Sequence, residues 1–395
     1  MAADGAAVGL DDVDQRRGGV HTLALCPVTR ATIGCVTSTT YRSPLLDLPG
    51  AAPLQDTDAL IDATGVAWHY GDPLGEQRRA HSGVVVVDRS HRRVVEVTGQ
   101  DTEEFLNNLL SQKFLDTAEG FGAGALDLDI QGRILHHADV VRTAEGVLLD
   151  VPAAQFESFL SFLQKMVFWS QVEVAEAELA VLTLLGASGD VVLPASVVAS
   201  RSVDWSAVER RDLLVPRAEL TSVVSELRSA GVEPAGLMAF TAERVRALEP
   251  ERAADLDDKS IPHEVPSFIG RGDRAGAVHL EKGCYRGQET VARVENLGRS
   301  PRVLVMLQLD GSAPENPTPG SEISGPAGGR ALGRIGTVVD DCDFGPIALG
   351  LIKRSALTGQ DLRVGDVAVM VDPASLPEEQ GEQAGRAAIN RLRGR

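Results

Sequence analysis

The sequence predicts a mixed α+β protein of about two or three domains that ends in a small all-β domain. The chain has 395 residues, and domains average roughly 150 residues. From residue 84 to residue 250, valine-rich strand patterns alternate with helical periodicities. After Cys284 the pattern changes to short β segments separated by Gly, Pro and Asn, which is typical of a small barrel or sandwich.

The composition is that of a soluble globular protein, with 43% hydrophobic and 24% charged residues. Acidic residues outnumber basic ones 56 to 38, and the net charge of −18 disfavours a general binder of nucleic-acid backbones. No uninterrupted apolar stretch approaches the roughly 18 residues of a membrane span, and the first residues lack the pattern of a secretory signal. We therefore expect a cytoplasmic protein without membrane or direct nucleic-acid partners.

Four cysteines, Cys26, Cys35, Cys284 and Cys342, lie far apart with no CxxC spacing. This spacing argues against a disulfide framework and against a self-contained zinc or iron–sulfur site, so no resident metal is predicted. A single reactive thiol remains open as an alternative.

Residues 1–65, the lead, show no sustained periodicity. Clear helix and strand patterns begin after them. The segment SGVVVVDRS predicts a strand covered on both faces, because it holds four consecutive valines. Asp101 is predicted to cap a helix, with Glu104 as its capping-box partner. Apolar residues at helical spacing predict an amphipathic helix over 153–167 whose aromatic stripe belongs to the core.

These signals divide the chain into five segments. We expect a poorly specified lead, a first α+β domain completed by a later segment, a second α+β domain, a C-terminal β-barrel and a polar tail. The expected bounds are 1–65 for the lead, 66–170 (completed by about 235–280) for the first domain, 171–234 for the second, 281–373 for the barrel and 374–395 for the tail.

The most informative segment reads KGCYRGQE, residues 282–289. The thiol of Cys284 has the cationic neighbours Lys282, Arg286 and Arg293, and a helix is predicted to begin near Gln288. Positive charge and a helix N-terminus both stabilise a thiolate, so we expect Cys284 to have a depressed pKa. The alternative is a small buried hydrophobe at a domain junction.

Three other sequence patterns give weaker indications of function. His136 and His137 are adjacent on a predicted strand, so they should point to opposite faces and act as ordinary polar residues rather than as a joint metal site. Glycines at 120, 122 and 124 are followed by Asp127 where a dinucleotide-binding loop needs its third glycine. Aspartates at 340, 341 and 343 lack the spacing of a calcium loop and predict a solvated turn.

The KGCYRGQE segment resembles the signature of the YgfZ family, folate-binding proteins of the glycine-cleavage T-protein (aminomethyltransferase) superfamily that support iron–sulfur enzymes. Further blocks resemble that family in the same order over about residues 66–373: WHYGDPLGEQR, VDRSHRRVVEVTGQD, LDIQGRI, DLDDKSIPHE, VARVENLGRSPR and GPIALGLIKR. The resemblance implies a T-protein-like three-domain ring around a central hole, built from two α+β domains and a C-terminal small β-barrel. Tetrahydrofolate or another reduced folate is then expected in the hole.

The resemblance also implies roles for particular residues. Cys284 matches the family's cysteine, and Arg244 falls where these proteins place an arginine near the folate. The alternative for Arg244 is an ordinary exposed helix arginine. The candidates for reactivity are Cys284, Lys282 and Tyr285; those for folate binding are Arg244, Asp127, His136, Gln288 and Glu289; and Gly283, Arg286 and Gly287 complete the motif.

One departure bears on activity. Where the transferase branch has an aspartate after the turn, this chain continues Gly132-Arg133-Ile134-Leu135 into His136-His137, so we do not expect aminomethyl transfer. The leading hypothesis is a folate-binding accessory protein for assembly or repair of iron–sulfur clusters in client enzymes, including tRNA-modifying enzymes, in which the Cys284 thiolate contacts a cluster transiently. The alternatives are a folate-dependent one-carbon transferase, with His136 or Asp127 replacing the carboxylate, and a scaffold with a vestigial pocket.

Overall fold

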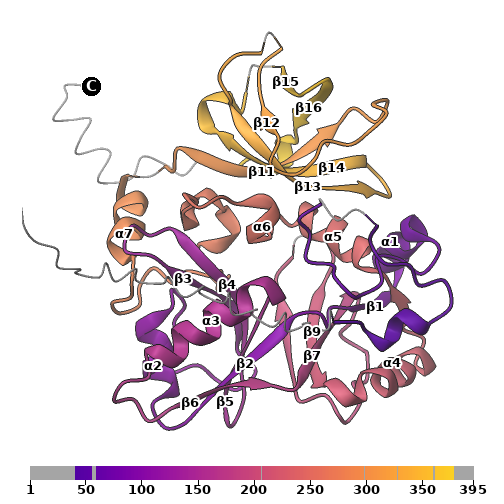
Figure 1. The fold of residues 1–395 in the computed structure, drawn as a ribbon. Helices are drawn as coiled ribbons and strands as arrows, with labels where there is room; N and C mark the ends of the chain where they lie inside the picture. The colour runs from indigo at the N-terminus through magenta and orange to yellow at the C-terminus, as the bar shows by residue number, and fades with distance from the viewer. Residues whose placement is uncertain are drawn as a thin grey trace, which may run out of the picture. The chain divides into compact units, whose positions relative to one another are not determined.

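The computed structural model describes residues 41–55, 59–205, 207–297, 299–326, 328–358 and 361–377. Within these ranges the strands form three sheets, which gives the mixed α+β class predicted from the sequence (Figure 1). No helix among these residues is long and apolar enough to span a membrane.

The first sheet is built around the run of valines. Its strands, in spatial order, are β10 (Glu233–Ala235), β1 (Val84–Asp88), β7 (Leu179–Gly186), β9 (Arg210–Pro216) and β8 (Ala199–Val203). Val85 and Val87 pack in one core cluster with residues of α1 (Pro73–Ser82) and α5 (Leu237–Arg246). Val86 packs in another, with residues of α4 (Leu220–Ser229). The valine strand is therefore covered on both faces, as its composition predicts.

The second sheet is antiparallel. Its strands, in spatial order, are β3 (Gly122–Leu128), β4 (Ile134–Arg142), β5 (Gly146–Val151), β2 (Arg93–Thr98) and β6 (Glu173–Ala177). Its core cluster also contains residues of α2 (Thr102–Leu109) and α3 (Ala153–Lys165). Phe156, Phe159 and Leu163 of α3 are fully buried, which confirms that the aromatic stripe belongs to the core.

The capping box predicted at Asp101 is wrong. Asp101 does precede α2, but its side chain makes no cap hydrogen bond there. Its carboxylate instead accepts a hydrogen bond from the backbone N–H of Gln171, at 2.7 Å. A contact with a distant segment has replaced the local one.

The third sheet forms the predicted C-terminal β domain. Its antiparallel strands, in spatial order, are β12 (Glu322–Ile323), β13 (Gly333–Asp341), β14 (Gly345–Lys353), β11 (Arg302–Leu309), β16 (Val367–Val371) and β15 (Leu362–Val364). A bridge between Ser324 and Arg363 links the two edges, so the six strands form a nearly closed barrel. Barrel strands contact α5 and the short α6 (Arg252–Asp255).

Part of the expected lead, among the described residues before 66, packs against the first sheet. Leu45, in the 3₁₀ turn η1 (Pro44–Asp47), is 2% exposed within the first sheet's core. Ser43 donates to the carboxylate of Asp88, and the hydroxyl of Tyr41 donates to Ser90 at 2.6 Å. A segment held by a few isolated contacts has no hydrophobic periodicity, so the sequence pattern does not predict its packing. Residues 1–40, with Cys26 and Cys35, and the tail from 378 lie outside the described residues.

A buried network of arginines and aspartates joins the first two sheets. On β9, Asp212 accepts hydrogen bonds from Arg201 at 2.8 Å and from Arg210 at 2.7 Å. Arg201 also reaches Asp150 of the second sheet, at 2.5 Å. Asp139 of β4 accepts from Arg210 at 3.3 Å. Arg89 and Arg92 complete the network, and each of these seven residues is at most 7% exposed.

The charges in this network depend on one another. Burial alone would raise the pKa of Asp212, but the guanidinium groups of Arg210, Arg201 and Arg89 outweigh it and hold the pKa well below its ordinary value. Removing one member of such a network leaves an uncompensated charge in a medium of low polarity, which costs more than an ordinary hydrogen bond.

Replacing Asp212 with Asn should therefore destabilise the protein by about 3–5 kcal/mol. Chemical unfolding of the full chain, followed by circular dichroism, measures the loss. Because the folded-state pKa of Asp212 is depressed, its contribution is present above the unfolded pKa of about 3.9 and disappears as the pH falls below it. The difference between wild type and Asp212→Asn should shrink accordingly in acid.

The matched control is Glu157→Gln, which removes a carboxylate whose side chain is 77% exposed and pairs with Arg93. An exposed ion pair contributes at most about 1 kcal/mol. Equal losses for the two variants would contradict a structural role for the buried network.

Candidate functional site

The KGCYRGQE loop is held at its start by Lys282. The Lys282 ammonium donates hydrogen bonds to the carbonyls of Asn107 and Leu110, at the C-terminal end of α2, and to that of Gln112 at 3.1 Å. The last carbonyls of a helix have no partner inside the helix, so this lysine satisfies groups that would otherwise be unpaired. Burial lowers the pKa of Lys282 to about 7.

The middle of the loop is held by three further residues. Tyr285 is 8% exposed within a core cluster. Arg286 donates to Asp127, and its guanidinium lies 4.6 Å from the centre of the Phe162 ring. Gly287 has a φ of +82°, and a Cβ there would lie 2.6 Å from the carbonyl oxygen of Asp129. This position therefore requires glycine.

Cys284 is exposed on this anchored loop, which excludes the buried hydrophobe considered above. The helix predicted after it is α7 (Gln288–Leu297). Two of the three cations expected around the thiol have other partners in the structure, because Lys282 donates to α2 and Arg286 pairs with Asp127. The sequence places these cations next to Cys284, but the fold uses them elsewhere.

A cavity of about 380 Å³ lies where the edge strand β8 of the first sheet meets the edge strand β3 of the second. This volume is within the range of small-molecule sites. Its lining is mixed: carboxylates, aromatic rings, a histidine and small residues. The polar and aromatic lining residues include His137, Asp139, Trp205, Glu249 and Phe268.

The glycines of β3 explain how the strands approach so closely. A Cβ at Gly122 would lie 2.5 Å from the Cβ of Arg201 on β8. A Cβ at Gly124 would lie 2.9 Å from that of Ala277 and 3.3 Å from Nε2 of His137, inside the cavity wall. The glycine run that fails as a dinucleotide loop therefore permits close packing around the cavity.

Two carboxylates of the cavity belong to the buried arginine network. Burial alone would raise the pKa of Asp139, but the surrounding arginines, Arg210 first, hold it well below its ordinary value. Glu249 accepts hydrogen bonds from Trp205 Nε1 at 2.7 Å and from Arg210 at 2.8 Å. Burial lowers the pKa of His137, which keeps its imidazole neutral, and its ring lies 4.8 Å from that of Phe268.

A second cavity, of about 790 Å³, shares Arg274 and Ala275 with the first. Its wall carries further cationic or basic side chains, those of Lys113, Arg271 and His279. It reaches Glu281, the residue before the motif loop. The loop therefore begins at the edge of a cavity system rather than at an isolated surface.

The structure does not support folate contact by Arg244. This side chain is 2% exposed and donates to Asp255 at 2.9 Å and to the Thr337 hydroxyl at 2.7 Å. It lines neither of these cavities. Its guanidinium instead links α5 and α6 to β13 of the barrel, so the alternative of an exposed arginine is also wrong.

Asp127 and His136 also line neither cavity. Asp127 is 1% exposed, and its carboxylate is 2.8 Å from Nδ1 of His136, whose Nε2 is 2.8 Å from the Ser158 hydroxyl. The prediction that the adjacent histidines face opposite sides is confirmed, but His137 is the one in the cavity. Gln288 and Glu289, at the start of α7, line neither cavity, and Glu289 is exposed.

Sequence reasoning missed the cavity residues themselves. His137 and Asp139 are alternate residues of β4 and so face the same side, and a charged residue inside a valine-rich strand is the signal that could have found them. Trp205 and Glu249 come from segments between regular elements and carry no such pattern.

Replacing Lys282 with Met should destabilise the protein by about 1–3 kcal/mol, because three buried carbonyls lose their donor. Chemical unfolding measures the loss, and hydrogen exchange of the motif loop should accelerate. The folded-state pKa of about 7 lies below the unfolded value of about 10.4, so wild type should gain stability over this variant between about pH 7 and pH 10. An unchanged variant, like the exposed control Lys165→Met, would contradict the anchoring role.

The chain is similar to several known proteins. Residues 302–378 match the family model of the CAF17 C-terminal beta-barrel domain. The chain is 26% identical over 263 residues to the tRNA-modifying protein YgfZ of Photorhabdus laumondii, covering 62% of this chain and 76% of that protein. It is 27% identical over 315 residues to a chloroplastic Arabidopsis thaliana protein named as a transferase, covering 72% and 69%.

The fold itself matches a solved structure. The glycine cleavage system aminomethyltransferase T from Bartonella henselae superposes with a TM-score of 0.68 at 19% identity, covering 85% of this chain and 97% of that one. The barrel model, the YgfZ relatives and this shared fold agree with the motif blocks of the sequence. The chain is therefore similar in sequence to YgfZ proteins and shares the fold of a glycine-cleavage T-protein, as the motif blocks predict.

Proposed function

We propose that this protein binds a reduced folate and serves as an accessory factor for iron–sulfur enzymes, including tRNA-modifying enzymes, with Cys284 as its contact residue. The observation that carries the proposal is the 380 Å³ cavity, whose carboxylates Asp139 and Glu249 are oriented by the buried Arg210. The name of the Photorhabdus relative, a tRNA-modifying protein, supports this class of client.

The lining of the cavity fits a pteridine ring. A reduced pteridine is a bicycle with one flat ring that donates several N–H groups along its edges, and a carboxylate accepts such donors without donating in return. Asp139 and Glu249 are acceptors of this kind, and Phe268 and Trp205 add apolar faces. The folate itself would supply a carrier for one-carbon units or reducing equivalents. The residues of this chain would bind and orient it.

The second cavity suits the other end of a folate. A folate carries a glutamate tail with free carboxylates, which bind best to cationic side chains. Lys113, Arg271, Arg274 and His279 line this cavity, which adjoins the first. We infer that the tail extends through this basic region toward the motif loop, so that Cys284 is beyond the end of the ligand rather than over the ring.

Cys284 is suited to contact a partner rather than to store a cluster. It is exposed on a loop that Lys282, Arg286 and Gly287 hold in place. Stable clusters need about four cysteine ligands, and in the described part of the chain the other cysteine is Cys342, in a turn of the barrel. A single thiol offers one ligand to an iron atom held mainly by a client, and its proton passes to solvent on binding.

A one-carbon transferase is the second candidate. Asp139 places a carboxylate in the cavity, and relatives include an aminomethyltransferase of Pseudomonas syringae pv. tomato, 25% identical over 230 residues. The route through Asp127 or His136 is not favoured, because both lie outside the cavity. Turnover of an aminomethylated carrier with tetrahydrofolate, lost in Asp139→Asn, would favour the transferase over the accessory role.

Filling the cavity should abolish folate binding. Ser202 lines the cavity from β8, so Ser202→Phe adds an aromatic ring there without removing a member of the arginine network. We expect calorimetry with 5-formyltetrahydrofolate to give at least tenfold weaker binding for Ser202→Phe. The control Thr221→Phe, on the exposed side of α4, should bind as wild type does.

Two results would count against the folate site. Equal affinity of wild type and Ser202→Phe would place the ligand elsewhere. Absence of binding to the wild-type protein would instead favour the vestigial scaffold.

Replacing Cys284 with Ser should leave folding and folate affinity unchanged but abolish complementation of a strain that lacks this activity, measured as the activity of its iron–sulfur enzymes. The control is Asn296→Ser, a small polar change at an exposed position of the neighbouring helix α7, which should complement fully. Full complementation by Cys284→Ser would remove the thiol from the mechanism while leaving the folate site intact.

A further inference from the structure

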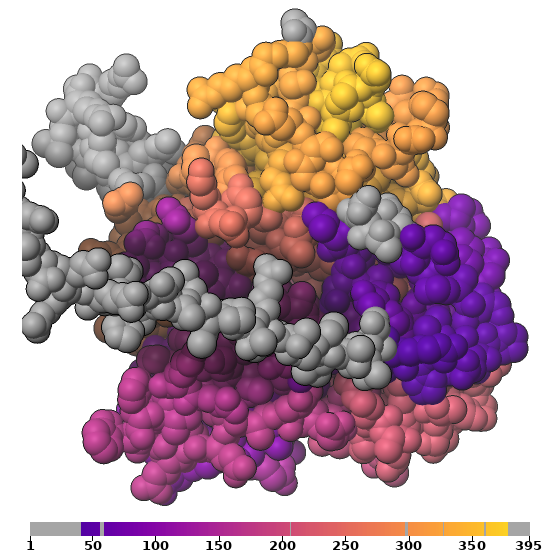
Figure 2. Space-filling model, in the orientation of Figure 1, coloured from indigo at the N-terminus to yellow at the C-terminus, as the bar shows by residue number. Residues whose placement is uncertain are grey.

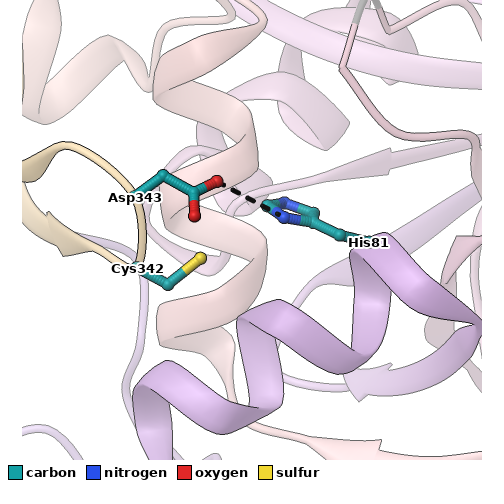
Figure 3. A group of neighbouring side chains, drawn as sticks. All are labelled: His81, Cys342 and Asp343. Atoms are coloured by element: carbon teal, nitrogen blue, oxygen red, sulfur yellow. Dashed lines mark ion pairs between the residues drawn. The ribbon is translucent and has the colours of Figure 1, made fainter.

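A second group of chemically active side chains lies outside the folate cavities. His81 comes from α1, and Cys342 and Asp343 come from the turn between β13 and β14. Their ligand atoms all lie within 4.8 Å of one another. Figure 3 shows the imidazole, the sulfur and the carboxylate converging on one space from the two elements. None of the three lines either cavity described above.

A buried carboxylate stands behind the histidine. Glu243 of α5 is completely buried, and its Oε1 is 2.6 Å from Nε2 of His81. Among the described residues its other oxygen has no hydrogen-bond donor, and Nε of Arg246 lies 3.8 Å from it. A metal-binding histidine usually donates its second ring N–H to a carboxylate in this way, which fixes the tautomer.

With Nε2 protonated and bound to Glu243, Nδ1 of His81 is left as a lone-pair donor. It lies 3.7 Å from Oδ2 of Asp343 (Figure 3). Bonds of about 2.0–2.2 Å in a tetrahedral zinc site place two ligand atoms roughly 3.4 Å apart. The observed separation therefore accommodates an ion between the two atoms with only a small adjustment.

The turn that carries Cys342 and Asp343 is fixed before any ion binds. The side chain of Gln77, on α1, donates to the carbonyl of Asp340 at 2.9 Å and accepts from the backbone N–H of Cys342 at 2.8 Å. Asp341 accepts from the N–H of Asp343, also at 2.8 Å. In Figure 2 the indigo part of the chain, which begins at residue 41, borders the orange barrel. Such support is what holds a ligand set in place.

The local charge favours a cation. The buried carboxylates of Glu243 and Asp341 and the exposed one of Asp343 face a single shared cation, Arg246, while Arg78 donates to the carbonyl of Cys342. Burial, together with Asp341 and Asp343, raises the pKa of Cys342 to about 11. A divalent ion would reverse this effect by stabilising the thiolate, with release of the proton to solvent.

We propose that Nδ1 of His81, the sulfur of Cys342 and the carboxylate of Asp343 bind a zinc-type divalent ion, and that Glu243 orients His81 for it. Sulfur, nitrogen and carboxylate together suit zinc rather than magnesium or calcium. Three protein ligands leave a fourth position for water. Because the ligands come from α1 and from the barrel, the ion would join these two parts of the protein.

Cobalt(II) is the probe, since a cobalt–thiolate bond gives a near-ultraviolet charge-transfer band. We expect the full chain to show this band, zinc to displace it, and Cys342→Ser to lose it. The band should persist in Cys284→Ser and in the double variant Cys26→Ser/Cys35→Ser. Glu243→Gln should retain the band but bind about 10- to 100-fold more weakly, as expected for a positioning residue.

Because Cys342 is half-buried, a second variant guards against misfolding. His81→Gln, on the exposed side of α1, should fold as wild type does by circular dichroism and bind cobalt at least tenfold more weakly. A band that survives in Cys342→Ser, that disappears in Cys284→Ser, or that fails to form at millimolar cobalt would overturn the proposal. Unchanged affinity in both His81→Gln and Glu243→Gln would do the same.

Discussion

The structure depends on a network of buried charged side chains, each of which would be strongly destabilising in the protein interior without an oppositely charged partner. Four arginines and three aspartates are buried between the first and second sheets, and each charge is tolerated only because the others are present. Asp139 and Glu249 take part in this network and also line the cavity. The interaction that joins the sheets therefore also lowers the pKa of Asp139 and holds both carboxylates in position.

The motif loop illustrates how a functional signature can be mostly structural. Lys282 closes the end of α2, Arg286 pairs with Asp127, and Gly287 permits contact with the β3–β4 turn. These contacts hold Cys284 on a fixed base while leaving it exposed. A mobile thiol would lose conformational entropy on binding a partner, whereas an anchored thiol has already lost that entropy during folding. Lys282 and Arg286, the cations next to Cys284 in sequence, thus serve to hold the loop in position.

The sequence predicts a structural feature well when that feature depends on residues close together in the chain. The doubly covered strand β1, the aromatic stripe of α3 and the barrel strands all repeat with a fixed period, so the sequence predicts them. The residues of the candidate site are harder to predict from the sequence. Strand alternation separates His136 from His137, but only the tertiary fold decides which of them faces the cavity. Lys282 meets a carbonyl 175 residues away, a contact with no periodic signal. Arg244 was predicted by family position and proved to be a structural link.

The central claim is that a reduced folate lies in the cavity between β3 and β8, with its ring against residues of the arginine network. The most direct measurement is a crystal structure of the full chain grown with 5-formyltetrahydrofolate. The account predicts density for the pteridine next to Asp139 and Glu249, with the glutamate tail directed toward Arg274 and the motif loop. Folate density at any other place, with this cavity filled only by water, would contradict it.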